Sequence, residues 1–480
     1  ALQHVYSGGF SGTAEVDAIG QTRVTMALSS EQFHYPLKPG EKLISPEVIL
    51  SFSQTGFSTL SQNLHLCLRE HVCRGYWRDR TRPVILNSWE ASYFDFGGDS
   101  IVRLAREAAS LGADLLLLDD GWFGHRCDDR RSLGDWKPNE AKLGGTLGDL
   151  IKKIRAEGVD FGIWMEPEMI SEDSDLFRRH PDWALAVPGR PPVRSRSQLV
   201  LDLTREDVRA YILDCICDTL NQGEVTCLKW DFNRSITDVW SQCADDQGRV
   251  LYDYILGLYA ILEAVLQRYP KLLIEGCSGG GGRFDAGMLY YTPQIWCSDN
   301  TDAIDRIKIQ YGTSFGYPMS ALSAHVSACP NHQTGRAAPI ATRVATALTG
   351  VHGYELDPAK ISEEARAEIK AQIADYHKYY DLIHYGDLYR LVSPWEDPYN
   401  CAWEFVDAEK TQALATYLIK FKKERRGLFL RLKGLDPAKF YRWEETGEVF
   451  SGALLMNAGI SLFRMPNEDG YSKTFYFKQI

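Results

Sequence analysis

Short apolar runs alternate with stretches of helical periodicity from Arg82 onward, and this alternation constrains the fold more than any other feature of the 480-residue chain. The stretches between the runs, such as 99–112 and 205–223, carry apolar residues at the three- and four-residue spacing of amphipathic helices. Strands that alternate with helices in this way predict a parallel sheet with helical crossovers. The apolar runs lie at 84–89, 114–120, 160–168, 226–233, 271–278, 294–300, 319–327 and 348–356.

Eight such runs in about 275 residues agree in number and length with a (β/α)₈ barrel, also called a TIM barrel. We therefore predict an α/β fold with the barrel at residues 81–384. The segment 198–204 (QLVLDLT) also resembles a strand, so the assignment of the barrel strands can shift by one.

The flanking segments have a different character. Within residues 1–80, TAEVDAIGQTRVTMALS and SPEVILSFSQTG read as strands, and a helix is expected near 58–73, which predicts the tail of an antiparallel sheet domain and a linker helix. After a long helix at 363–386, the strand-like segments 387–394, 413–422, 427–434, 453–465 and 471–478 predict a C-terminal antiparallel β domain at 385–480.

Composition limits the partners and the compartment. A formal net charge of −11 argues against nucleic acid or an acidic membrane surface as a partner, and the chain has no apolar run of about 20 residues. The 11 cysteines show no zinc or disulfide framework, so a zinc site is not expected. Free thiols in this number favour a reducing compartment, which agrees with a cytoplasmic location. The chain opens at Ala1 without Met, so we expect that an N-terminal portion is missing and leave a signal peptide open.

The segment CLKWDFNR (227–234) places polar residues on what should be a buried strand. Residues two apart share a face of a strand, so Lys229, Asp231 and Asn233 project together. In a barrel enzyme, the carboxyl ends of the strands surround the active site. We therefore interpret this polar strand end as part of a pocket.

Other runs end in the same way, with acids and indoles. Asp119 and Asp120 close one run, Asp299 follows Trp296 in another, and Trp89 ends the first. Because successive side chains of a strand alternate, Asp119 and Asp120 cannot both point inward from an ideal strand. We therefore expect at least one of them to sit on a bend, and one can be purely structural. Together these residues would form an acidic pocket with aromatic walls. Such a pocket suits a neutral polyol, because carboxylates accept hydrogen bonds from hydroxyls and aromatic rings stack on C–H faces.

Two carboxylates are sufficient to break a glycosidic bond. Lys229 beside Asp231 should keep that carboxylate ionised, as a nucleophile requires. Asp299, next to Trp296 and without an evident cation, is the better candidate for a raised pKa and for the general acid. Thr301 or Asp302 is expected to cap a helix that follows it.

Linked motifs at these positions closely resemble the α-galactosidases of glycoside hydrolase family 36. The motifs are LLLLDDGWFG, SLGDW, GIWMEPEMI, RSQLVLDL, LKWDFNR, CSGGGGRFD, WCSDNTDAI and SAHVSACPNHQTGR, in family order and from roughly residue 40 to the C-terminus. The resemblance implies a retaining enzyme with Asp231 as nucleophile and Asp299 as general acid/base. It also implies that residues 1–80 are the remnant of an N-terminal β-sandwich, and that the intact protein is a homo-oligomer, a tetramer.

The resemblance further implies a sugar site and no metal or other cofactor. Asp119, Asp120 and Lys229 would hold the galactose 4- and 6-hydroxyls, and Trp89 and Trp164 would form its walls. The remaining implied contacts to the sugar come from Arg196, Asn233, Cys277, Gly280 and Trp296. The expected substrates are oligosaccharides of the melibiose and raffinose type, cleaved at terminal non-reducing α-D-galactosyl residues.

Several alternatives remain at this stage. The 277–280 segment would lie near a 2-substituent of the sugar, so an α-N-acetylgalactosaminidase or a galactosyl-transferring member is possible. A catalytically silent carbohydrate-binding fragment is a further alternative. His325 and His332 suggest a metal-dependent barrel hydrolase as another alternative, although we expect both histidines to be structural. The segment GCSGGGGR is glycine-rich but lacks the Lys-Ser/Thr of a phosphate-binding loop, so we do not expect it to bind phosphate.

Overall fold

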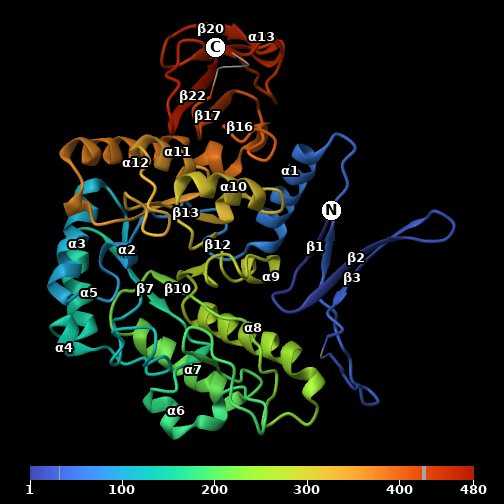
Figure 1. Cartoon of the computed structure of the whole chain (residues 1–480), viewed down its shortest axis with the longest axis vertical. Helices are drawn as coiled ribbons and strands as arrows, with labels where there is room; N and C mark the ends of the chain where they lie inside the picture. The colour runs from blue at the N-terminus through green and yellow to red at the C-terminus, as the bar shows by residue number, and fades with distance from the viewer. Residues whose placement is uncertain (32, 424–428) are drawn as a thin grey trace.

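The core of the molecule is a closed barrel of eight parallel strands, and this confirms the predicted fold class. The computed structural model describes residues 1–31, 33–423 and 429–480. Figure 1 shows the barrel in the middle of the molecule, below the C-terminal sheet. Its strands are β5 (Ile85–Asn87), β6 (Leu115–Leu118), β7 (Asp160–Met165), β10 (Cys227–Trp230), β11 (Leu273–Gly276), β12 (Gln294–Trp296), β13 (Leu322–Ser327) and β14 (Val351–Glu355).

The barrel strands are buried on both faces, which explains their continuous apolar runs. In β6, Leu115 pairs with Ile85 of β5 on one side and with Asp160 of β7 on the other. The barrel closes where β14 pairs with β5. The ambiguous segment 198–204 is not a barrel strand, because β9 (Leu199–Val200) pairs antiparallel with β8 (Met169–Ile170) outside it.

Helices and short helical turns connect the strands. They are α2 (Trp89–Ser92), α3 (Gly98–Leu111), α4 (Glu140–Leu143), α5 (Leu147–Ala156), α6 (Asp175–Arg179), η2 (Pro181–Trp183), α7 (Glu206–Leu220), η3 (Gln247–Arg249), α8 (Val250–Arg268), α9 (Ala286–Leu289), α10 (Ala303–Thr313), η4 (Met319–Ala321), α11 (Ile340–Ala347), η5 (Pro358–Lys360) and α12 (Glu363–Tyr385). The span Gln247–Arg268, which includes α8, is long and apolar enough to cross a membrane. Half of it is buried inside the molecule, as in a core helix.

The start of α10 matters for the site, because this helix follows the loop that carries Asp299. The Asp302 carboxylate caps the helix and accepts hydrogen bonds from the backbone N–H groups of Ile304 (2.9 Å) and Asp305 (3.1 Å). Asp302 was one of the two residues expected to cap this helix.

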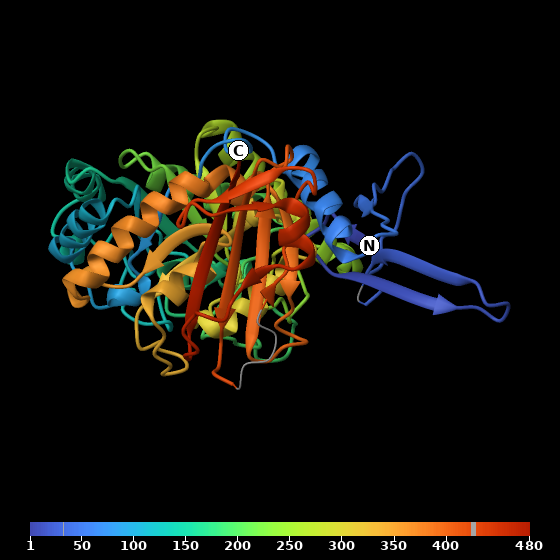
Figure 2. The same cartoon turned by 90° about the horizontal axis from the view of Figure 1, so that it is seen from above.

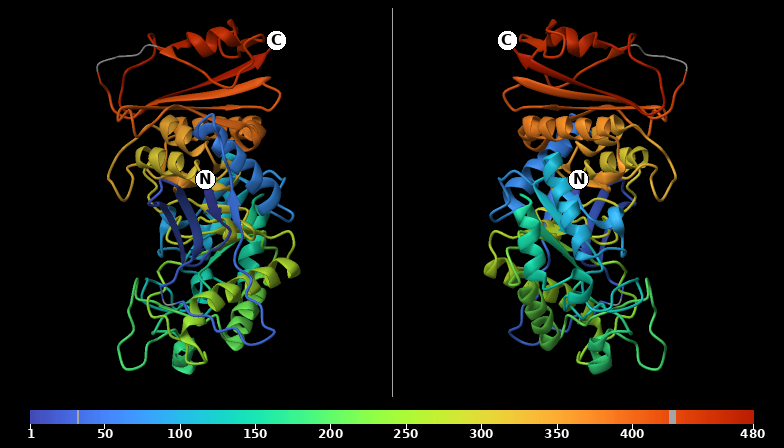
Figure 3. Two further views of the ribbon diagram at one scale, coloured as in Figure 1. Left: turned by 90° about the vertical axis from the view of Figure 1, so that its right-hand side faces the viewer. Right: turned by 90° about the vertical axis from the view of Figure 1, so that its left-hand side faces the viewer.

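A six-stranded antiparallel sheet packs over α11 and α12 and forms the layer at the top of Figure 1, as the side views of Figure 3 also show. In spatial order its strands are β15 (Asp387–Val392), β16 (Asn400–Val406), β17 (Gln412–Ile419), β22 (Tyr471–Gln479), β19 (Phe440–Trp443) and β20 (Val449–Ser451). Two short strands, β18 (Phe429–Leu430) and β21 (Ile460–Ser461), pair beside it. Part of the expected strand 427–434 lies outside the described residues.

The prediction of a strand over 453–465 was wrong in its first half. Gly452–Asn457 is helix α13, and the Ser451 hydroxyl caps it by accepting a 3.1 Å hydrogen bond from Leu454 N–H. Short apolar runs do not separate a strand from a buried helical turn, and the cap decided the outcome here.

The N-terminal residues form two separate pairs of strands and a helix. β1 (Leu2–His4) pairs with β4 (Val48–Leu50), and β2 (Phe10–Val16) with β3 (Thr22–Leu28). The β2–β3 hairpin projects away from the barrel with most side chains exposed (Figure 2). The expected linker helix is α1 (Phe57–Cys67), continued by η1 (Leu68–Val72).

Candidate active site

A cavity of about 210 Å³ lies at the carboxyl ends of the barrel strands. Ten of the twelve residues that the sequence singled out line it. The lining residues are Trp89, Glu90, Asp119, Asp120, Trp164, Arg196, Lys229, Asp231, Asn233, Trp296, Asp299, Thr301, His332, Gln333 and Glu355. The strand-end residues therefore do meet in one pocket, where barrel enzymes hold their chemistry.

Asp231 follows β10 directly and remains attached to the barrel, because its backbone N–H donates to the Met165 carbonyl over 2.9 Å. Its carboxylate accepts hydrogen bonds from Trp164 Nε1 (3.0 Å, to Oδ2) and from the Phe232 backbone N–H (2.8 Å, to Oδ1). Burial alone would raise the pKa of Asp231, but the Lys229 charge and the hydrogen bonds of this carboxylate hold it below its ordinary value. Asp231 is therefore ionised at neutral pH.

Lys229 lies between the carboxylates of the pocket. Its Nζ forms a buried ion pair with Asp119 Oδ2 at 2.8 Å, and Asn87 Nδ2 donates to the same oxygen over 2.8 Å. The lysine was expected to stabilise the Asp231 carboxylate; it does so as a neighbouring charge, while its direct partner is Asp119.

Asp119 and Asp120 both line the cavity, which an ideal strand would not allow, and the expected bend is present. The reason is that β6 ends at Leu118, so both residues lie on the turn beyond the strand, where alternation no longer applies. Arg126 donates hydrogen bonds to the Asp120 carboxylate from Nε (3.0 Å) and Nη2 (2.8 Å), and its side chain is almost fully buried. This pair fixes the Asp120 carboxylate at the cavity wall.

Asp299 lies beyond β12 and accepts a hydrogen bond from Trp296 Nε1 over 2.9 Å. Burial and the neighbouring Asp231 charge raise the pKa of Asp299, against the opposing influence of Lys229 and Arg196. The buried Arg306 donates to the carbonyls on either side of Asp299, at Ser298 and Asn300, over 2.8 Å each. The loop that carries Asp299 is thus held from α10.

Cys277 and Gly280, the two predicted residues that do not line the cavity, lie behind the carboxylates. The Cys277 thiol is buried and is one of the groups that lower the pKa of Asp231 by hydrogen bonding. Gly280 has φ +86°, and a Cβ there would lie 2.6 Å from the Asp299 backbone nitrogen. Only glycine allows so close an approach of these two loops.

The remaining predicted residues form the walls. Trp164 and Trp296 are each 2% exposed, and Trp89 packs edge-to-face against Phe94 with ring centroids 5.2 Å apart. Arg196 lies at the rim in a left-handed backbone conformation, with φ +49° and its Nη2 3.4 Å from Asp129 Oδ1.

Sequence reasoning missed five lining residues: Glu90, Thr301, His332, Gln333 and Glu355. Glu90 accepts a hydrogen bond from the Thr301 hydroxyl (2.7 Å) and faces His332 Nδ1 at 3.3 Å. Burial raises the pKa of both Glu90 and Glu355. Glu355 ends its apolar run as the predicted acids do, so the same signal could have found it.

Glu166 supports the site from behind the cavity. It accepts hydrogen bonds from Gln198 Nε2 (2.7 Å) and from the Asn233 backbone N–H (2.5 Å), and burial together with the Asp231 charge raises its pKa to about 8. Among the residues that the structure describes, no group of three or more His, Cys, Asp or Glu side chains is arranged to hold a metal ion.

Two family models match the chain. The model described as Melibiase matches residues 43–386, and the Glycosyl hydrolase family 36 C-terminal domain matches residues 400–477.

Curated relatives include the bifunctional alpha-galactosidase/sucrose kinase AgaSK of Mediterraneibacter gnavus, 54% identical over 459 residues. Alpha-galactosidase AgaA of Geobacillus stearothermophilus is 48% identical over 461 residues. Each alignment covers 95% of this chain, but only 48% of the first protein and 63% of the second. The chain thus spans about half to two thirds of the length of these relatives.

Solved structures give the same relationship. The crystal structure of AgaA from Geobacillus stearothermophilus matches with a TM-score of 0.97 at 46% identity, over 100% of this chain and 67% of that one. The galactosidase domain of AgaSK matches with a TM-score of 0.96 at 53% identity, over 100% of this chain and 66% of that one. Barrel, C-terminal sheet and family models agree, and the chain belongs to glycoside hydrolase family 36.

Proposed function

We propose that the chain carries the catalytic part of a retaining exo-α-galactosidase, which hydrolyses terminal non-reducing α-D-galactosyl residues of melibiose- and raffinose-type sugars. One observation carries the proposal: Asp231 and Asp299 line the same cavity, and their pKa values are shifted in opposite directions. Glycoside hydrolysis by two carboxyl groups needs one that is ionised and one that holds a proton. The retaining course of the reaction is proposed from the similarity to family 36 enzymes.

In the first step, an oxygen of Asp231 forms a bond to C1 of the galactosyl unit while the glycosidic C1–O bond breaks. Asp299 gives its proton to the departing oxygen, so the aglycone leaves as an alcohol. In the second step, Asp299 takes a proton from water, the water oxygen bonds to C1 and the ester to Asp231 breaks. Two inversions at C1 give net retention.

The other residues of the cavity suit a sugar with several hydroxyls. Asp119 and Asp120 offer carboxylate oxygens, and each is already oriented, by Lys229 and by Arg126. Preoriented carboxylates bind hydroxyls without having to reorganise. The indoles of Trp89, Trp164 and Trp296 present apolar faces for the C–H groups of the ring.

The relatives support this choice of substrate. A variant of AgaA from Geobacillus stearothermophilus has been solved in complex with raffinose, and another in complex with stachyose. We extend this substrate class to the present chain. We also propose that the protein is cytoplasmic and that it forms a homo-oligomer. Light scattering would measure the mass of this oligomer.

The decisive experiment follows the stereochemistry of the products. The first-formed sugar from an aryl α-galactoside should be α-galactose by ¹H NMR; release of the β-anomer first would contradict retention. With azide present, Asp299→Ala should yield α-galactosyl azide, because azide attacks the galactosyl ester. Asp231→Ala should yield the β-azide, because azide takes the place of the missing carboxylate.

The same assays separate the alternatives. Preference for an aryl 2-acetamido-2-deoxy-galactoside would indicate an α-N-acetylgalactosaminidase, and transfer products with added galactose would indicate a transferase. Binding of galactose without turnover by the wild-type chain would indicate a silent binding fragment. Loss of activity in EDTA, restored by a divalent cation, would indicate a metal-dependent hydrolase.

A further inference from the structure

Arg390 of β15 is a buried cation without a carboxylate partner among the described residues. Its side chain lies between the C-terminal sheet and the barrel, with the residue only 8% exposed. Nη1 donates to the Ser61 hydroxyl over 3.1 Å, and Nη2 donates to the Ser314 hydroxyl over 2.6 Å. Nε is buried and has no hydrogen-bond partner.

The two serines orient the guanidinium but do not neutralise it. The Ser61 hydroxyl donates its own proton to the Phe57 carbonyl (2.8 Å), and Ser314 donates to the Tyr311 carbonyl (2.7 Å). Burial lowers the pKa of Arg390 only to about 10, so the group remains charged at neutral pH. The Phe315 ring, with its centroid 3.9 Å from the guanidinium carbon, gives partial compensation.

An uncompensated buried charge is strongly destabilising, so buried charges are normally paired. Within the part of the chain that the structure describes, the titratable groups beside Arg390 do not supply a negative charge. His65, which contacts the Ser314 carbonyl over 2.7 Å, has a pKa lowered by burial to about 3 and is neutral, while burial raises the pKa of Tyr311 and keeps it protonated. No carboxylate of the described residues pairs with Arg390, which leaves an anion from solution as the candidate counter-ion.

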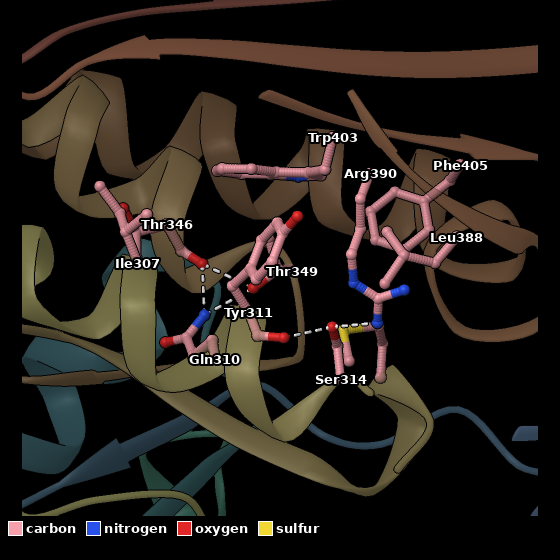
Figure 4. Close-up of a pocket in the computed structure, with 11 residues that line it drawn as sticks. Ile307, Gln310, Tyr311, Ser314, Thr346, Thr349, Leu388, Arg390, Trp403 and Phe405 are labelled. Atoms are coloured by element: carbon pink, nitrogen blue, oxygen red, sulfur yellow. Dashed lines mark hydrogen bonds between the residues drawn. The ribbon is translucent and has the colours of Figure 1, made fainter. Parts of the chain in front are cut away.

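A cavity of about 30 Å³ adjoins the guanidinium, between α10, α11 and the sheet strands β15 and β16 (Figure 4). Its lining residues are Ile307, Gln310, Tyr311, Ser314, Met319, Thr346, Thr349, Leu388, Arg390, Trp403 and Phe405. A water molecule needs about 10–15 Å³ of such space, so the cavity holds one or two waters or one monatomic ion, and it is too small for a sugar.

We propose that this cavity binds a monovalent, halide-sized anion, chloride in ordinary solution, as the counter-ion of Arg390. The ion would accept the free N–H of Arg390 Nε within this cavity. Its binding joins three parts of the molecule, since Ser61 belongs to α1, Ser314 follows α10 and Arg390 belongs to the C-terminal sheet. An anion that binds only the docked arrangement stabilises the packing of the sheet on the barrel.

Bromide tests the site directly in the unaltered chain. Crystals grown or soaked in sodium bromide, with data collected at the bromine absorption edge, should show an anomalous peak beside Arg390 Nε. An ordered water without anomalous signal at that position, with bromide visible elsewhere in the crystal, would overturn the proposal.

Thermal unfolding gives the second test. At constant ionic strength, replacing gluconate with chloride should raise Tm in a saturable manner, and bromide should act similarly. Arg390→Gln should abolish this anion-specific gain, whereas Arg442→Gln, which removes an exposed arginine paired with Glu444 on the same sheet, should retain it. Equal chloride responses in the wild type and Arg390→Gln would refute the site. If Arg390→Gln does not fold, the bromide experiment on the wild type decides.

Discussion

Trp164 donates its indole N–H to Oδ2 of Asp231 over 3.0 Å, and across the pocket Trp296 donates in the same way to Oδ1 of Asp299 over 2.9 Å. Each candidate catalytic carboxylate therefore has an indole that both forms a wall of the cavity and stabilises negative charge. Removing either hydrogen bond raises the pKa of the carboxyl group concerned. Because the two acids need opposite protonation states, the two removals should have opposite consequences.

Trp164→Phe should move the acid limb of the pH profile of kcat/KM to higher pH. Asp231 must be ionised in the free enzyme, and activity falls as pH drops through its pKa, which this variant raises. A hydrogen bond to a charged group contributes about 1.5–3 kcal/mol, so we expect a loss of about tenfold or more in kcat/KM. An acid limb that stays in place would contradict the role of Asp231.

Trp296→Phe is the matched partner, and it should move the alkaline limb instead. Asp299 must be protonated for the first step, and activity falls as pH rises through its pKa. Loss of the Trp296 hydrogen bond raises this pKa further, so the alkaline limb moves to higher pH. In Asp299→Asn this limb should disappear, with turnover reduced on the order of 10²–10⁴-fold.

Gly280→Ala should impair catalysis beyond its effect on stability. The added Cβ would lie 2.6 Å from Asp299 N and 2.7 Å from Ser298 Cα, which displaces the candidate acid. A displacement of about 1 Å costs on the order of 10²-fold in rate. Gly20→Ala is the control, since Gly20 has a similar φ of +83° and a Cβ added there would meet no atom within 4 Å.

Both glycine variants should lose about 1–2 kcal/mol of stability from left-handed strain. Only Gly280→Ala should also lose kcat toward aryl α-galactosides. Similar kcat values for the two variants would show that the contact with Asp299 is unimportant.

Arg306→Met should lower kcat while leaving KM nearly unchanged. Arg306 donates to the Ser298 and Asn300 carbonyls and does not line the cavity, so its loss frees the Asp299 loop without removing a cavity-lining side chain. A rise in KM at constant kcat would instead place Arg306 in substrate binding. Circular dichroism and Tm would establish that the variant is folded.

Glu404→Gln should stabilise the protein more at pH 8 than at pH 5. Burial raises the pKa of Glu404 from 4.5 to about 8 against the hydrogen bond and charge of Lys433, so the folded state holds a proton that the unfolded state has lost. The contribution of Glu404 to stability is fully present below pH 4.5 and declines as pH rises toward about 8. Glutamine has no proton to hold, so its advantage grows over this interval.

Denaturant unfolding of Glu404→Gln and the wild type at several pH values would measure this difference. Glu409→Gln, at an exposed position in the β16–β17 turn, serves as the control and should show no such trend. A stability difference for Glu404→Gln that does not change with pH would contradict the prediction.

The sequence predicted the barrel and most of the pocket because both depend on local patterns. A buried parallel strand needs a continuous apolar run, and a polar residue directly after it can only lie at the barrel mouth. Asp231 and Asp299 were identified in this way, and Lys229, inside β10, was identified because it shares a strand face with Asp231. The orientation of Asp119 and Asp120 was harder to predict, because it depended on whether the strand ended at Leu118 or continued.

Strand patterns could not predict the lining residues that lie on helices and loops. Glu90 lies in a four-residue helix after β5, and His332 comes from the long loop after β13, so neither had a strand register to place it. The pairing of Lys229 with Asp119, 110 positions apart, depends on the order of strands around the barrel. Helix α13 was missed because its N-cap outweighs the strand propensity of the apolar run that follows.

Asp231 and Asp299 are supported by different means: one continues a hydrogen-bonded strand, whereas the other lies on a loop held by an arginine from the next helix. The two supports can therefore be altered independently. Under the proposed mechanism, engineering of the leaving-group side of the reaction should start from α10 and its contacts. Changes there would move the proposed proton donor, Asp299, while the proposed nucleophile, Asp231, stays attached to the barrel strands.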